Sequence, residues 1–106
     1  MEKLDIKRGW FSKIDGDKLP QIMKDIFGNV EERDGWFISK YGAMQPIKVK
    51  PLSKSELGVE INTIKIPDDE VLDTMRKRNK FFELTTGFDS KQRLKRLKKK
   101  AKNGKL

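Results

Sequence analysis

The sequence predicts an α+β two-layer sandwich, with an antiparallel sheet of about four strands and a helix pair on one of its faces. Two observations lead to this fold class. Short segments between residues 3 and 63 alternate apolar with polar side chains, which is typical of strands that bury one face. Two longer segments, 17–27 and 68–86, instead carry apolar residues at helical spacing. The expected order is strand, helix, three or four strands, helix, and then a basic C-terminal helix.

The first strand is expected within residues 3–11, where Leu4 and Ile6 alternate with charged neighbours. The first helix follows at residues 17–27. Asp17 is its expected N-cap, because a carboxylate at that position can accept a hydrogen bond from an otherwise unpaired backbone N–H. Gly28 is expected to end the helix in the left-handed conformation that glycine adopts readily.

A hairpin is expected next. Arg33-Asp34-Gly35 is a turn signal, so residues 30–32 are expected to pair with the aromatic-rich segment 36–41. In that segment, alternation places Trp36 and Lys40 on one face of the sheet and Tyr41 on the other. One of these two sets is therefore expected to be exposed or to lie in an interface.

Two further strands are expected at residues 46–51 and 57–63, both with clear alternation. Pro46 and Pro51 flank the first of them. Because proline donates no hydrogen bond to a neighbouring strand, these residues favour a strand with abrupt ends or one at the edge of the sheet.

The second helix is expected to open at Asp68, the first of three acidic residues that complement the helix dipole, and to stop at Gly87. Asp89 and Gln92 then have the spacing of a capping box, in which each side chain bonds the other residue's backbone N–H. A third helix is therefore expected over residues 90–101.

The positive charge is concentrated at the C-terminus. Residues 89–106 hold nine Lys or Arg and one acid, whereas residues 1–88 hold 16 basic and 15 acidic side chains. The chain's net charge of +9 thus belongs almost entirely to a basic arm, 89–106, attached to a nearly neutral compact domain, 1–88. A block of like charges attracts polyanions, and this makes the arm the main candidate for function.

Composition argues against several function classes. There is no Cys and no His, so a thiol nucleophile, a thiolate metal site and the usual neutral-pH general base are all missing. Carboxylates gather only at residues 31–34 and 68–70, where a hairpin rim and a helix first turn explain them better than a metal site does. We therefore expect a non-enzymatic protein without metal or other cofactor. No apolar run approaches a membrane span and the N-terminus lacks a signal-peptide core, which favours a cytoplasmic location.

Three segments, KRGW near the start, KYGAMQPIKV in the middle and RKRNKFFELTTGFDSKQRLKRLKKKAK at the end, resemble a small family of uncharacterised archaeal proteins of about this length. The most specific part is TTGFDSKQRLKRLKKKAK, because it passes directly from a glycine-stopped helix to a basic one. The resemblance covers essentially the whole chain and implies a single domain. It implies no activity, cofactor or site residue.

The arm predicts binding to the phosphate backbone of nucleic acid, RNA ahead of DNA, because such contacts are electrostatic and independent of sequence. An acidic protein, a membrane surface or a merely solubilising tail are the alternatives, and the absence of Trp and Phe in the arm weakens the membrane role. The second helix contributes further cations to the expected patch. The candidate residues are Lys91, Arg93, Lys95, Arg96, Lys98, Lys99, Lys100 and Lys102, extended by Arg76, Lys77, Arg78 and Lys80.

Aromatic residues near the N-terminus and in the meander give a second candidate surface. If some lie on the open face of the sheet, they can stack on unpaired bases beside nearby lysines. Most strand aromatics belong to a core, however, and exposed ones also mark homodimers. A structural or interaction module, homodimeric through Leu94 and Leu97, is the alternative function. The aromatics are Trp10, Phe11, Trp36, Phe37 and Tyr41, and the lysines are Lys40, Lys48 and Lys50.

Overall fold

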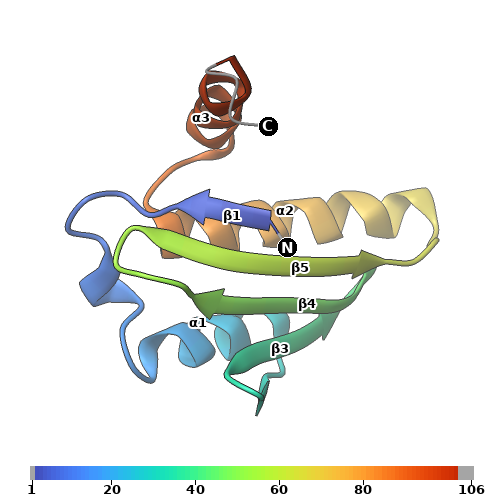
Figure 1. Cartoon of the computed structure of the whole chain (residues 1–106). Helices are drawn as coiled ribbons and strands as arrows, with labels where there is room; N and C mark the ends of the chain where they lie inside the picture. The colour runs from blue at the N-terminus through green and yellow to red at the C-terminus, as the bar shows by residue number, and fades with distance from the viewer. Residues whose placement is uncertain (1, 103–106) are drawn as a thin grey trace.

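The computed structural model describes residues 2–102, with side chains described up to residue 99, and it has the α+β architecture that the sequence predicts. Five strands and two main helices form two layers, and a third helix stands apart above the edge of the sheet (Figure 1). The elements are β1 (Glu2–Asp5), the 3-10 turn η1 (Phe11–Lys13), α1 (Lys18–Phe27), β2 (Glu31–Arg33), β3 (Trp36–Tyr41), β4 (Met44–Pro51), β5 (Glu56–Thr63), α2 (Asp68–Thr86) and α3 (Ser90–Lys102).

The sheet is antiparallel throughout, in the order β1-β5-β4-β3-β2. It has five strands and not about four. The fifth strand is β2, the short strand expected from the hairpin turn, whose three residues pair with β3 across a two-residue turn in which Asp34 and Gly35 both have positive φ. Three residues are too few for alternation to show in the sequence, so only the turn signal could indicate this strand.

One face of the sheet forms the core together with α1 and α2. Leu57 and Val59 of β5 and Ile47 and Val49 of β4 are fully buried on this face. Helical spacing explains why α1 and α2 present an apolar side to these strands. The helices contribute Leu19, Met23, Phe27, Phe81 and Phe82 to the same cluster.

Four local expectations are corrected. β1 ends at Asp5, and residues up to 11 form a loop and η1 rather than a longer strand. β4 is the central strand and not an edge, and the register shift between Met44 and Ile47 accommodates Pro46 there. Asp17 precedes α1 without a side-chain capping bond, while Pro67 holds the cap position of α2 that Asp68 was expected to fill.

The N-terminal loop completes the C-terminal end of α2. Lys7 N–H donates to Thr86 O at 2.7 Å, and Trp10 Nε1–H donates to Leu84 O at 2.8 Å. These donors reach carbonyls that have no partner within the helix. Gly87, with φ of +80°, then turns the chain out of α2 and toward β1. This turn sets where α3 begins.

Candidate nucleic-acid interface

The basic arm is a capped helix attached to the domain. Asp89 Oδ1 accepts from Gln92 N–H at 2.8 Å, and Gln92 Oε1 accepts from Asp89 N–H at 3.0 Å. The capping box expected from the sequence is therefore confirmed. The reciprocal bonds fix the first turn of α3 immediately after the α2–α3 linker, residues 87–89. The helix therefore starts in a defined direction.

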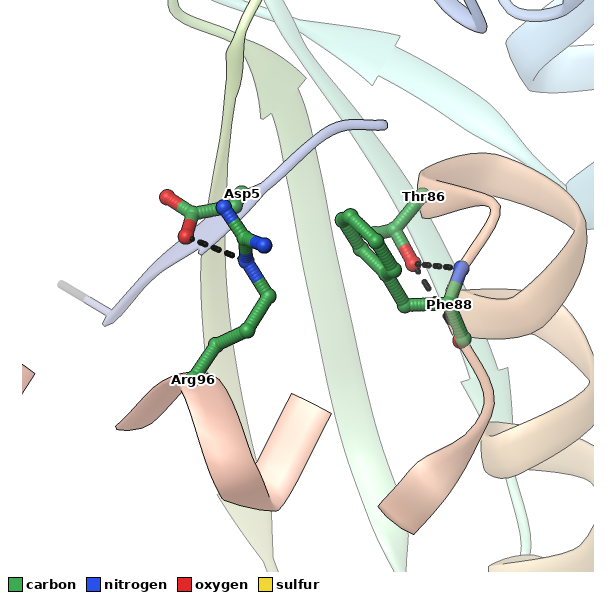
Figure 2. Close-up of polar contacts among 4 residues, drawn as sticks. All are labelled: Asp5, Thr86, Phe88 and Arg96. Atoms are coloured by element: carbon green, nitrogen blue, oxygen red, sulfur yellow. Dashed lines mark hydrogen bonds and ion pairs between the residues drawn. The ribbon is translucent and has the colours of Figure 1, made fainter. Parts of the chain in front are cut away.

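Arg96 joins α3 to the first strand. Its Nε–H donates to Asp5 Oδ2 at 2.8 Å, and its guanidinium carbon lies 4.6 Å from the centre of the Phe88 ring. Figure 2 shows Arg96 reaching from α3 to Asp5, with Phe88 held at the end of the linker. Buried Thr86 fixes this linker, because its hydroxyl donates to Phe82 O at 2.6 Å and accepts from Phe88 N–H at 3.2 Å.

Arg93 provides the second attachment. Its two terminal nitrogens donate to Phe88 O at 2.7 Å and to Asn79 Oδ1 at 3.1 Å, and its guanidinium carbon lies 5.5 Å from the Phe82 ring centre. Burial lowers the pKa of Arg93, and the neighbouring charge of Arg78 lowers it further. Two of the cations expected to bind phosphate therefore hold α3 against the domain.

The exposed lysines of α3 share one face, and Arg93 lies on the opposite side of the helix. An α-helix turns about 100° per residue, so residues 91, 95, 98 and 99 share one arc and residue 93 lies across the helix axis from it. Residue 96 lies beside this arc, about 60° beyond residue 99. All four lysines are exposed, and none forms an ion pair with any described residue. Lys100 and Lys102 belong to the same candidate set, but their side chains fall outside the described part of the chain. The outward-facing residues are Lys91, Lys95, Lys98 and Lys99.

A hollow of about 620 Å³ lies beside the lysine face. Phe88 and Arg96 form a cation–π contact in its wall, and cationic side chains surround them. The hollow thus combines a guanidinium–aromatic pair with positive charge. Its lining residues are Phe88, Gln92, Lys95, Arg96, Lys98 and Lys99.

The cations of α2 do not form one surface with these lysines. Arg76 and Lys80 are exposed, whereas Lys77 and Arg78 are half-buried. The helical rotation puts Arg76 and Lys80 about 160° around α2 from Arg78. Of the four, Arg78 is the one that lines a groove between α2 and α3, on the flank of α3 away from the lysine face.

The expected aromatic residues have mainly structural surroundings. Four of the five, Trp10, Phe11, Phe37 and Tyr41, pack against the core cluster. Trp36 lies on the open face of the sheet with Lys50 Nζ 5.3 Å from a ring centre. The aromatic residue beside the arm's cations is Phe88, which is not among the five aromatic residues expected from the sequence. Asp5 and Asn79, which bind the arm's arginines, carry no local sequence signal for that role.

No helix among residues 2–102 is long and apolar enough to cross a membrane. That same part of the chain contains no group of three or more carboxylates arranged to hold a metal ion. A family model described as a domain of unknown function, DUF5611, matches residues 1–99, which confirms the resemblance to an uncharacterised family. No curated protein and no solved structure matches the chain.

Proposed function

The chain belongs to the DUF5611 family, and we propose that it binds single-stranded nucleic acid, RNA ahead of DNA, through the lysine face of α3 without catalysing a reaction. The observation that carries this proposal is the separation of roles on one short helix. Arg93 and Arg96 hold α3 in place by hydrogen bonds to the domain. The lysines opposite Arg93 and next to Arg96 are left exposed for a polyanion.

The hollow beside this face favours unpaired over duplex nucleic acid. A strand whose phosphates contact Lys95, Lys98 and Lys99 passes next to the Arg96–Phe88 pair. Guanidinium planes and aromatic rings stack on exposed bases, which a duplex does not offer. RNA comes first because proteins recognise RNA mainly through its unpaired loops, bulges and ends.

Fluorescence anisotropy with a labelled oligouridine and a labelled DNA duplex tests the proposal across a series of salt concentrations. Four lysines that each neutralise one phosphate give a log–log salt slope of about −3 for a single strand. Replacing these lysines by Gln should remove most of this slope and weaken binding at least tenfold. The same number of exposed lysines elsewhere provides the charge-matched control, which should bind within about twofold of the unmodified protein. The test variant changes Lys91, Lys95, Lys98 and Lys99, and the control changes Lys24, Lys40, Lys54 and Lys65.

Equal binding by the two variants would contradict the proposal, since the attraction would then depend on net charge alone. The alternative is a homodimeric interaction module. It is supported by the exposure of Leu94 and Leu97, at 54% and 42%. Light scattering separates the two functions. We expect a monomer, because each chain carries a net charge of +9 and two copies repel each other. A dimer that dissociates on Leu94→Asn would favour the alternative.

A further inference from the structure

A groove of about 420 Å³ lies on the other flank of α3, between this helix, α2 and the β1–β5 end of the sheet. It has no lining residue in common with the hollow beside the lysine face. Much of its lining is apolar, and three of these side chains are unusually exposed for their type, Met75 at 44%, Leu94 at 54% and Leu97 at 42%. The remaining apolar side chains are Leu4, Ile61 and Phe82.

Two arginines lie among these apolar residues. Arg78 is half-buried, and no hydrogen bond or ion pair joins its side chain to any residue in the described part of the chain. Its Nε is buried and unpaired. Arg93 uses its two terminal nitrogens for Phe88 O and Asn79 Oδ1, which leaves several of its five donor hydrogens unused.

The charges of Asp89 and Glu83 act on Arg93, but neither carboxylate forms an ion pair with Arg78 or Arg93 in the described part of the chain. Arg78 and Arg93 are close enough for the first charge to lower the pKa of the second, so the two cations repel each other in a half-buried setting. Glu2 is the acidic residue in the lining, but it is exposed and pairs with neither arginine within residues 2–102. An anion between the guanidinium groups would relieve their repulsion and accept their unused hydrogens.

We propose that the α2–α3 groove binds a small anion that carries an apolar body, with its carboxylate or phosphate head held by Arg78 and Arg93 and its body lying on Leu94, Leu97 and Met75. Both parts of the lining are required for this ligand class. A bare inorganic anion leaves the leucines exposed, and an uncharged apolar molecule leaves the arginines unpaired. The proposal is independent of nucleic-acid binding, because the two surfaces lie on different flanks of α3 and use different residues.

Nitrogen-15 NMR of the full chain tests this proposal, with the Arg Nε–H signals as the readout. Octanoate is the probe, octyl phosphate tests the other head group, and acetate and octanol each present one half of the ligand. We expect a saturable shift of the Arg78 and Arg93 signals with octanoate or octyl phosphate. Acetate and octanol should each bind at least tenfold more weakly. The stronger of the two amphiphiles identifies the head group.

Two variants and a matched control locate the site. Arg78→Gln should weaken binding of the stronger amphiphile at least tenfold, while Arg76→Gln, on the far side of α2, should leave it unchanged. If Arg78→Gln fails to fold, Leu94→Asn replaces it, since this exposed leucine contributes to the groove and not to the core. Equal binding of acetate and octanoate, equal effects of the two arginine variants, or no saturable shift would each overturn the proposal.

Discussion

Arg96 and Asp5 are 91 positions apart in the chain, yet Arg96 Nε lies 2.8 Å from Asp5 Oδ2 and joins α3 to β1. The Asp5 side chain is 19% exposed and the Arg96 side chain is 50% exposed, so water reaches Arg96 more readily than Asp5. Because water screens the two charges, such an ion pair contributes little to the free energy of unfolding of the whole domain. Its importance is local, because it is one of the attachments that orient the lysine face.

Asp5→Asn should therefore loosen α3 without unfolding the domain. We expect a loss of about 1 kcal/mol or less in the free energy of unfolding, together with faster amide hydrogen exchange confined to α3. Glu31→Gln is the control, since it removes the more exposed Arg33–Glu31 pair and should change neither quantity. Unchanged exchange in Asp5→Asn would mean that Arg93 alone positions the helix.

The parts of the fold that the sequence predicts are those determined by neighbouring residues. The Asp89–Gln92 capping box and the glycine stop at Gly87 follow from local chemistry, and both are present. Contacts between distant segments leave no such signal. Nothing near Asp5 or Arg96 indicates that they meet, so the sequence alone places Arg93 and Arg96 in one binding set with the lysines of the arm.

The central position of β4 illustrates the same limit. Pro46 suggested an edge because proline lacks a backbone donor, and that reasoning considers one strand by itself. In the sheet, the ladder shifts register between Met44 and Ile47 and so tolerates the proline between two neighbouring strands. Whether such a shift exists depends on both partners, which a single segment does not reveal.

Gly87 should be the glycine least tolerant of substitution among the helix ends. A Cβ at this position would lie 2.8 Å from Trp10 Cδ2 and 2.9 Å from Lys7 Cβ, in addition to the strain of φ at +80°. Gly28 has a similar φ of +84° but open space around it. The loss of unfolding free energy in Gly28→Ala therefore measures the backbone strain alone, at about 1–2 kcal/mol. Urea unfolding should show a larger loss for Gly87→Ala than for Gly28→Ala. Equal losses would mean that the Trp10 loop moves aside at no cost.

Tyr41 gives the protein a stability change at alkaline pH. Its hydroxyl donates to Asp73 Oδ2, and this hydrogen bond, followed by desolvation and the carboxylate's charge, raises the pKa of Tyr41 above its ordinary value of 10.0. Because the folded state favours the protonated phenol, the stabilisation is complete below pH 10 and is lost as the pH rises through the raised pKa. Tyr41 is the single tyrosine, so tyrosinate absorbance reports it directly. Asp73→Ala should lower this pKa toward 10.0, and Asp69→Ala, on the same helix, should leave it unchanged. A pKa that Asp73→Ala does not move would rule out the hydrogen bond as its cause.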